Sequence, residues 1–216
     1  MSSTIILASA SPRRRELISL LGIPVTIESS RYEEPPAPAT VVSLPDLVIS
    51  LATEKAREVA ARLQITGSIV IGADTLVTLS TGDMGVPLGK PADLNDARRM
   101  LRELSGNSHF VYTGLALAIY RDGAVAVAST AYERTTVRFR PLTEEMILQY
   151  LNTGEPMDKA GAYGAQGYAS PFIESFHGDF YNVVGLPLCT LGKLLEEIGY
   201  NWSSQRSPEH MPEVTA

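Results

Sequence analysis

One apolar run constrains the fold of this chain more than any other segment. Residues 68–73 read Ser-Ile-Val-Ile-Gly-Ala and are the best candidate in the sequence for a buried strand. Asp74 follows at once, so we expect its carboxylate at the C-terminal end of that strand. The rest of the fold must therefore supply a sheet and the layers that cover it.

Strands and helices alternate on both sides of this run. Residues 4–8 are a second short apolar stretch, and Ser11-Pro12 reads as a helix N-cap with proline at the first helical position. Arg121-Asp122-Gly123 joins two longer strand-like stretches as a hairpin. We therefore expect an α/β fold, a mixed twisted β-sheet flanked by helices. The expected strands are 4–8, 68–73, 110–120 and 124–139; the expected helices run from Pro12 to a stop at Gly22 and over about 45–63, 93–104, 143–152 and 187–198, with a Gly- and Tyr-rich loop region before the last.

Length and composition fit one folded domain. The chain has 216 residues, of which 44% are hydrophobic and 19% charged, and these values are typical of a globular protein that folds alone. After Tyr200 the sequence turns polar, with Trp202 as the exception. We expect a single domain over residues 1–200 and a polar, flexible tail over residues 201–216.

Charge and cysteine content limit the possible partners. A formal net charge of -6 gives no broad attraction for nucleic acid or an anionic membrane, so an anionic ligand must meet a local basic cluster. Cys189 is the only cysteine, which rules out an internal disulfide. The residues after Met1 read as a strand rather than a signal peptide, and no apolar run reaches the ~20 residues of a membrane span. We expect a cytoplasmic protein with neither a nucleic-acid nor a membrane partner.

Three consecutive arginines, residues 13–15, occupy the first turn of the expected helix. Cations are unfavourable there by about 0.3 to 1 kcal/mol each, because that end of the helix dipole is positive. Free backbone N–H groups, a hydroxyl from Ser9 or Ser11 and a guanidinium would together make a phosphate cradle. The alternative is that the arginines are solvated or paired with Glu16. The position after a buried strand favours the ligand, because ligands gather at the carboxyl ends of strands in α/β sheets.

Lys55 and Asp74 are two further anomalies. Lys55 falls on the inward, apolar face of the expected helix 45–63, where an ammonium group needs a counter-charge unless it reaches solvent along its stem. Asp74 is well placed for catalysis or metal binding, although an aspartate that merely begins a turn is the commoner explanation. The apolar neighbours of Lys55 on that face are Val48, Leu51, Ala52, Ala56, Val59 and Leu63.

Two loops carry weaker candidates. Glu33 and Glu34 precede a proline-rich stretch that forbids regular structure, and they could add a metal ligand or be an ordinary solvated pair. Lys90, in Gly89-Lys90-Pro91, is a basic residue on a loop and is suggestive only together with the others.

Several separated motifs resemble one family. Leu7-Ala8-Ser9-Ala10-Ser11-Pro12-Arg13-Arg14 and Gly72-Ala73-Asp74-Thr75 look like the motifs of the Maf family of nucleotide pyrophosphatases. Further segments agree in order, and the resemblance runs from about Ile5 to Gly199. These segments are Gly89-Lys90-Pro91, Leu104-Ser105-Gly106, Gly154-Glu155-Pro156, Asp158-Lys159-Ala160-Gly161-Ala162-Tyr163-Gly164 and Asn182-Val183-Val184-Gly185-Leu186-Pro187.

The resemblance implies both a fold and a reaction. It implies a mixed α/β fold with a nucleotide-binding cleft, like that of Maf and ITPase proteins, a homodimer, a divalent cation (Mg or Mn), and hydrolysis of nucleoside triphosphates between the α- and β-phosphates. It makes Asp74 the general base and puts Glu34 near the metal or the attacking water. Whether Asp74 also binds the metal stays open at this point. The phosphate-binding residues it implies are Ser9, Arg13, Arg14, Lys55 and Lys90.

Substrate preference follows from one branch of the family. Residues 158–164 together with Gln166 are similar to the branch that acts on dTTP and UTP, and the resemblance associates Arg13, Thr75 and Gln166 with that choice. A glutamine amide can donate to a carbonyl oxygen and accept from the ring N–H, which suits thymine or uracil. Gln166 could instead be a loop residue bonded to backbone. Less familiar residues flank it at Ala165 and at 168–171, and residues 80–86 lengthen the approach to Lys90.

Other functions remain as alternatives. Within the enzyme class, these are a preference for 7-methyl-GTP and a broad specificity for nucleoside triphosphates. From another class, a regulator of cell division could sense a nucleotide without hydrolysing it, but such a protein has no use for a base beside the α-phosphate. Direct nucleic-acid binding is disfavoured because the chain is acidic and has no basic stripe with interleaved aromatic residues.

Overall fold

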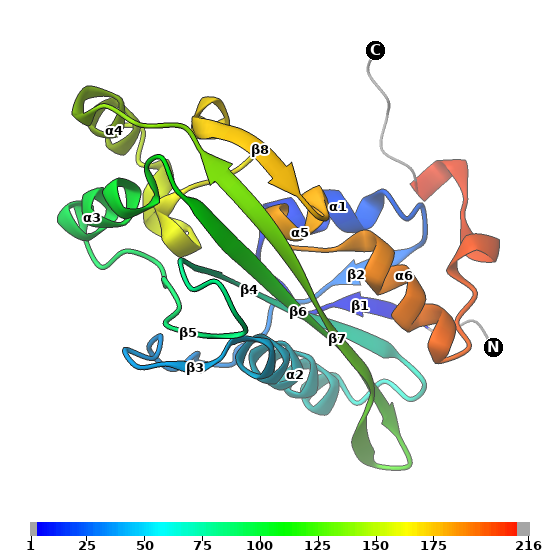
Figure 1. Ribbon diagram of the computed structural model, residues 1–216. Coiled ribbons are helices and arrows are strands. Elements are labelled where there is room, and N and C mark those ends of the chain that lie inside the picture. The colour runs from blue at the N-terminus through cyan, green and yellow to red at the C-terminus, as the bar shows by residue number, and fades with distance from the viewer. Residues whose placement is uncertain (1–3, 211–216) are drawn as a thin grey trace.

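A mixed sheet forms the centre of the structure, a computed structural model that describes residues 4–210 (Figure 1). Its strands lie in the order β2-β1-β4-β6-β7-β8. The pairs β2–β1 and β1–β4 are parallel, whereas each pair from β4 to β8 is antiparallel, so the expected mixed sheet is confirmed. The strands are β1 (Ile5–Leu7), β2 (Val25–Ile27), β4 (Ile69–Thr78), β6 (Ser108–Arg121), β7 (Ala124–Phe139) and β8 (Ile173–His177).

Helices cover both faces and one end of this sheet. Helix α2 packs along β4 and β6 on one face, α1 and α6 belong to the opposite layer, and α3 packs against α4 at the end (Figure 1). A two-stranded sheet of β3 and β5 lies beside α2. The helices are α1 (Pro12–Ser19), α2 (Leu44–Leu63), α3 (Leu94–Leu104), α4 (Glu144–Leu151), α5 (Phe180–Val184) and α6 (Leu188–Glu197), and the small strands are β3 (Val42–Ser43) and β5 (Met84–Gly85).

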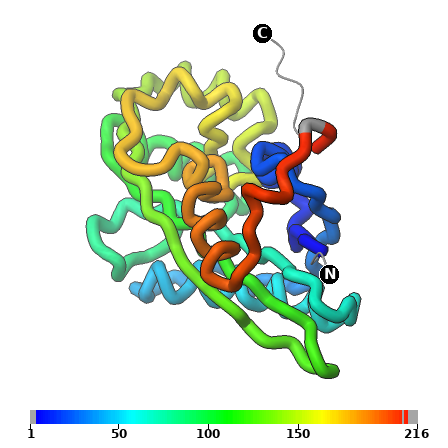
Figure 2. Tube along the Cα trace, turned by 90° about the vertical axis from the view of Figure 1, so that its right-hand side faces the viewer, coloured from blue at the N-terminus to red at the C-terminus, as the bar shows by residue number. Residues whose placement is uncertain are grey.

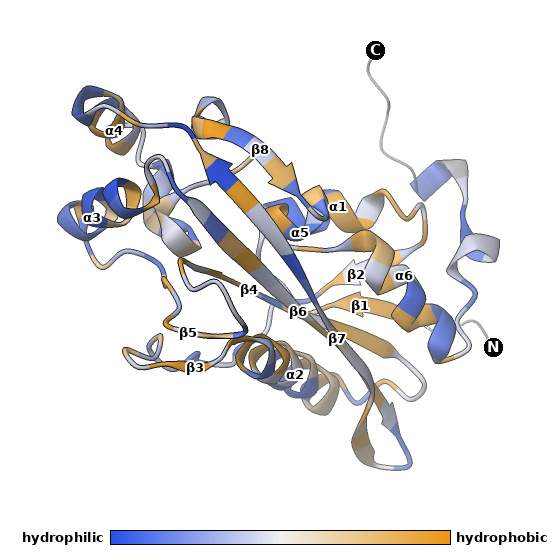
Figure 3. Cartoon of the chain, viewed as in Figure 1, coloured by the Kyte–Doolittle hydropathy of each residue, from blue (hydrophilic) through white to orange (hydrophobic). Residues whose placement is uncertain are grey.

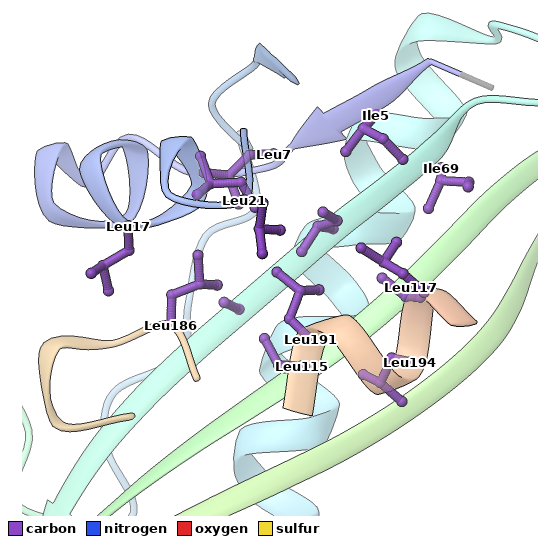
Figure 4. Close-up of a cluster of buried hydrophobic side chains, with 14 of the residues drawn as sticks. Ile5, Leu7, Leu17, Leu21, Ile69, Leu115, Leu117, Leu186, Leu191 and Leu194 are labelled. Atoms are coloured by element: carbon purple, nitrogen blue, oxygen red, sulfur yellow. The ribbon is translucent and has the colours of Figure 1, made fainter. Parts of the chain in front are cut away.

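The side chains of β4 alternate between two hydrophobic cores. Ile69, Ile71 and Ala73 pack with residues of α1 and α6, as Figure 4 shows for Ile69 and its labelled neighbours, whereas Val70 packs under α2. This period of two places Asp74 on the α2 side of the sheet and Thr75 on the α1 side. Figure 3 shows hydrophobic residues along β1, whose three residues are all buried.

Local signals set the helix starts that the sequence predicted. The Ser11 hydroxyl accepts a hydrogen bond from the Arg14 N–H, with Pro12 at the first helical position of α1. Asp93 caps α3 in the same way. The Arg121-Asp122-Gly123 hairpin is confirmed as well, and Figure 2 shows this turn projecting beyond the rest of the protein.

The expected end of the central strand was wrong. Strand β4 does not stop before Asp74 but continues to Thr78, because β6 pairs with it along that whole length and Asp74 lies opposite Gly114. On the other side the parallel partner β1 stops at Leu7, opposite Ile71. Asp74 therefore lies inside a strand, yet beyond the carboxyl end of the neighbouring strand.

The Gly- and Tyr-rich region has more regular structure than expected. It contains β8, α5 and the 3-10 helices η1 (Glu155–Asp158), η2 (Ala160–Ala162) and η3 (Ser170–Phe172). The proline-rich loop after Glu34 has no helix or strand, as expected.

Part of the expected tail is described. It forms the 3-10 helices η4 (Trp202–Gln205) and η5 (Pro208–His210), and Trp202 packs against the core formed with α1 and α6. Residues 211–216 lie outside the described part, and the domain boundary at residue 200 stays a prediction. Of the helices described, none is both long enough and apolar enough to span a membrane.

Candidate functional site

A cleft of about 680 Å³ opens where β1 ends beside β4. Its size is in the range of small-molecule sites. The first turn of α1, the inward side of α2, the proline-rich loop and residues 158–166 all contribute to its walls. The residues singled out from the sequence that line it are Arg13, Arg14, Glu34, Lys55, Asp74, Thr75, Lys90 and Gln166.

Lys55 joins two carboxylates at the centre of this cleft. Its Nζ lies 2.5 Å from Asp74 Oδ1 and 2.5 Å from Glu34 Oε1. Lys55 is only 9% exposed and Asp74 only 7%, so both charges are largely removed from water. The counter-charge that the apolar surroundings of Lys55 demanded is thus present, and it comes from two other elements of the chain.

Two glycines allow α2 to lie close enough to the sheet for this contact. A Cβ added to Gly72 on β4 would collide with the carbonyl oxygen of Ala52, and one added to Gly114 on β6 would collide with the Val48 carbonyl. Because these positions have no side chain, the helix backbone rests directly on the strands. Lys55, one turn after Ala52, is thereby brought to Asp74.

Burial and charge act in opposite directions on the two carboxylates. Burial raises the pKa of Asp74 above its ordinary value, although the charges of Lys55 and Arg14 oppose the shift. Glu34 is more exposed, and although burial favours its neutral form, the hydrogen bond and charge of Lys55 hold its pKa below the usual range. Of the two, Asp74 has the pKa better suited to accept a proton near neutral pH.

Arg14 enters the cleft from the opposite layer of the fold. Its Nε donates to the Gly185 carbonyl at 2.7 Å and its Nη2 donates to Thr75 Oγ1 at 2.9 Å. Thr113 Oγ1 donates to the Asn182 carbonyl, so Thr75 must donate to Thr113 in turn. Burial lowers the pKa of Arg14, and the charges of Asp74 and Glu34 oppose this. The guanidinium stays charged and is fixed in direction.

The two serines near α1 have different positions. Ser11 lines the cleft and caps the helix, whereas Ser9 is 6% exposed, does not line the cleft, and accepts a hydrogen bond from the Ser11 N–H. The phosphate-binding role implied for Ser9 stays a prediction.

Gln166 has an exposed side chain at the rim of the cleft. Within residues 4–210 its amide makes no hydrogen bond, so the alternative of a glutamine bound to backbone finds no support there. Sequence reasoning missed Tyr163 and Lys159, which also line the cleft. The Asp158-Lys159 pair was a signal for the second of these, since a lysine beside an implied phosphate site is a candidate ligand.

The chain is similar to one known protein family over most of its length. A sequence profile of the family described as Maf-like protein matches residues 4–198, nearly the whole described chain. The chain belongs to the Maf family.

Three relatives of this chain have the same name. The dTTP/UTP pyrophosphatase of Symbiobacterium thermophilum is 48% identical over 196 residues, which cover 91% of this chain and 94% of the relative. The protein of the same name from Pelotomaculum thermopropionicum is 46% identical, with 91% and 97% covered. The one from Moorella thermoacetica is 47% identical, with 91% and 96% covered.

A divalent cation in this Maf protein could be held either by protein side chains alone or by protein carboxylates together with the phosphates of the substrate. No group of three or more His, Cys, Asp or Glu residues able to hold a metal occurs in the described part of the chain. Mg²⁺ more often binds to one or two carboxylates together with substrate phosphates. Glu34 and Asp74, which share Lys55, offer those two carboxylates.

Proposed function

We propose that this protein hydrolyses dTTP and UTP to the nucleoside monophosphate and pyrophosphate. One observation carries the proposal: a buried carboxylate, Asp74, stands in a cleft that five cationic side chains also line. The names of the relatives at 46–48% identity support the same activity. The cations are Arg13, Arg14, Lys55, Lys90 and Lys159.

The cationic residues bind the triphosphate. A triphosphate has close to four negative charges at neutral pH, and the cations around the cleft offset them and stabilise charge that develops at the α-phosphorus. Arg14 is held by Thr75 and Gly185 before the substrate arrives, so it loses little freedom on binding. Glu34 and Asp74 are the residues that would hold a divalent cation. When bound, Mg or Mn would add positive charge against the phosphates.

Asp74 serves as the general base. It accepts a proton from a water molecule whose oxygen bonds to the α-phosphorus, while the bond from that phosphorus to the α–β bridging oxygen breaks and pyrophosphate leaves. A positioned base contributes roughly 10²- to 10⁴-fold to such a rate. The burial that raises the pKa of Asp74 makes its carboxylate a stronger base than an exposed aspartate.

Gln166 reads the base of the nucleotide. Its amide N–H donates to O4 and its carbonyl accepts from N3–H of uracil or thymine, whereas CTP has the inverse pattern at these two positions. Each of the two hydrogen bonds contributes about 0.5 to 1.5 kcal/mol, so their loss corresponds to roughly ten- to hundredfold discrimination against CTP. Thr75 and Arg13 complete this specificity set.

Further expectations from the sequence belong to the same proposal. The protein forms a homodimer and works in the cytoplasm, with a nucleotide as its ligand and neither nucleic acid nor membrane as a partner. Light scattering of the purified protein tests the dimer, and a mass equal to one chain at micromolar concentration would rule it out.

A nucleotide panel assayed for pyrophosphate tests the activity. With Mg²⁺ or Mn²⁺ present, we expect dTTP and UTP to be hydrolysed fastest and CTP at least tenfold more slowly. Fastest turnover of 7-methyl-GTP would assign the protein to another branch, and equal rates on all nucleotides would indicate broad specificity. Binding without release of pyrophosphate would favour the nucleotide-sensing regulator.

A further inference from the structure

The segment that carries Gln166 is organised around the carboxylate of Glu155. Glu155 Oε1 accepts a hydrogen bond from the Tyr150 hydroxyl at 2.9 Å, and Oε2 accepts one from the Tyr168 N–H at 2.9 Å. The Tyr150 oxygen in turn accepts a hydrogen bond from the Gly164 N–H at 3.2 Å. One carboxylate thus holds both ends of residues 164–168, directly at Tyr168 and through Tyr150 at Gly164.

Gln166 lies inside a tight turn between these two attachments. The Gly167 N–H donates to the Gly164 carbonyl at 3.1 Å and closes the turn Gly164-Ala165-Gln166-Gly167. A Cβ added to Gly164 would lie 2.7 Å from Glu155 Oε1, and one added to Gly167 would overlap the carboxylate. Glycine at both ends therefore lets the turn wrap closely around Glu155.

Glu155 itself does not line the cleft, whereas Gln166 does. No hydrogen bond to another described residue holds the Gln166 amide, so its direction depends on the backbone of the turn. Lys159 Nζ donates to the Glu155 carbonyl at 3.1 Å and to Asp158 Oδ1 at 2.6 Å, which fixes the backbone on which Glu155 stands.

We propose that Glu155 is a positioning residue that sets the base selectivity of the enzyme by holding the turn that presents Gln166. This inference rests on the proposed function, because it needs Gln166 to read the base. Selectivity requires the amide of Gln166 at a defined place, and a turn free to move would present it to uracil and cytosine alike.

The ratio of kcat/KM for UTP to that for CTP tests this proposal. In Glu155→Gln both hydrogen bonds lose the negative charge that strengthens them. The amide oxygen can still accept from the Tyr168 N–H, but the amide nitrogen can only donate, so the Tyr150 hydroxyl must change from donor to acceptor while it also accepts from the Gly164 N–H. We expect the UTP to CTP ratio to fall about two- to tenfold, mainly through slower turnover of UTP. Tyr150→Phe, which frees the Gly164 end of the turn, should lower the ratio in the same direction.

Glu144→Gln is the matched control. Glu144 is also a carboxylate that accepts two hydrogen bonds, from Arg98 and Arg102 on α3, but it does not contact residues 164–168. We expect its ratio to equal that of the wild type. If Glu155 had a merely structural role, its replacement would reduce the folded fraction of the protein. Turnover of UTP and CTP would then fall equally, and the ratio would not change.

Two further measurements test whether Glu155 acts through Gln166 and whether it holds the turn. In the Gln166→Ala background, Glu155→Gln should not lower the ratio again, because the residue through which it acts is gone. Hydrogen exchange of the Tyr168 amide should accelerate in Glu155→Gln, whatever the substrate.

An unchanged UTP to CTP ratio in Glu155→Gln, or additive losses in the double variant, would overturn the positioning role while the pyrophosphatase activity stands. Absence of pyrophosphate from wild-type protein with either nucleotide would overturn the proposed function and the base-reading role with it.

Discussion

Asp74 and Thr75 are neighbours in the chain but serve opposite layers of the fold. Asp74 meets Lys55 of α2, whereas Thr75 meets Arg14 of α1. Both reach one cleft because β1 ends at Leu7 and leaves this part of β4 without a parallel neighbour. A shift of one residue in the register of β4 would move each of the two side chains to the opposite face of the sheet. The site therefore depends on the pairing of Asp74 with Gly114.

Replacement of Asp74 tests the base at the residue scale. We expect Asp74→Asn to fold normally and to lose at least about 10²-fold in kcat, because the isosteric amide cannot accept the proton. Asp122→Asn, at the exposed β6–β7 turn, is the control and should keep full activity. Turnover of Asp74→Asn within a few-fold of wild type, at an unchanged melting temperature, would show that the base is another residue.

The pH profile gives a second measure of the same residue. Burial raises the pKa of Asp74, and only its ionised form accepts a proton, so kcat/KM should fall as the pH drops through that raised pKa. With little divalent cation bound, the acid limb should therefore lie above the ordinary aspartate value of about 3.9, and a cation bound to Asp74 would move it to lower pH. It should be absent from the residual activity of Asp74→Asn, and an identical limb in that variant would assign the titration to another group.

Arg13 and Arg15 form a matched pair for testing phosphate binding. Arg13 lines the cleft, whereas Arg15 is exposed outside it. The experiment uses the Asp74→Asn background, in which the nucleotide is not hydrolysed during the measurement. At a nucleotide concentration a hundred times the dissociation constant, binding should stabilise the fold by about 2.7 kcal/mol. Arg13→Ala should shrink the resulting rise in melting temperature and Arg15→Ala should not. Equal shifts in both variants would place Arg13 outside the binding site.

At the scale of elements, the position of α2 on the sheet decides whether Lys55 reaches Asp74. The helix backbone rests on Gly72 and Gly114, and small residues such as Ala52 and Ala56 continue the close contact. This explains why Lys55 remains buried with its counter-charges rather than reaching solvent along its stem.

Gly72→Ala should separate these two elements. The added methyl group meets the Ala52 carbonyl, so we expect a loss of about 1 to 3 kcal/mol in unfolding free energy and a marked fall in kcat as Lys55 moves from Asp74. Gly82→Ala is the control, because a Cβ there meets nothing within 4 Å. Urea unfolding and steady-state kinetics check both variants, and a fully active, fully stable Gly72→Ala protein would refute this account of the α2 contact.

At the scale of the whole molecule, stability at acid pH depends on the buried side chain of His109. His109 on β6 is fully buried beside Phe139, and its Nε2 lies 2.8 Å from the Tyr163 hydroxyl at the cleft wall. Burial lowers the pKa of His109 to about 3, so the folded protein keeps it neutral while the unfolded chain binds a proton below pH ~6.5. The unfolded state is therefore favoured as the pH falls between these two values.

His109→Gln should remove this acid sensitivity. Between pH 7.5 and pH 5 the wild type should lose about 2 kcal/mol more unfolding free energy than the variant, as measured in urea. His177→Gln, on the exposed part of β8, should behave like the wild type. Parallel pH dependence in the wild type and His109→Gln would mean that His109 titrates normally in the folded protein.

The sequence predicted local features of the molecule better than its long-range ones. Ser11, Asp93 and the apolar run 68–73 act on their own neighbourhood, and the elements they predicted are present. The end of β4 was missed because its length depends on pairing with β6, more than thirty residues away. Strand β8 was missed because its residues are mostly exposed and it pairs only with β7, so it has no hydrophobic pattern.

The candidate site could be anticipated to a similar degree. The inward position of Lys55 predicted a counter-charge, but nothing local indicated that Glu34 and Asp74 would supply it together. The contacts of Glu155 with the turn around Gln166 were also not predicted, because they depend on how the short helix η1 folds back on α4 and on residues 164–168. Side-chain contacts between separate elements decide both arrangements.

Hydrolysis of UTP in water enriched with ¹⁸O shows which phosphorus the water attacks. Mass spectrometry of the products from the wild-type protein locates the incorporated oxygen. Attack on the α-phosphorus predicts one ¹⁸O atom in UMP and none in pyrophosphate, with the same distribution at a far lower rate for Asp74→Asn. Label in pyrophosphate, or release of orthophosphate from UTP, would contradict it.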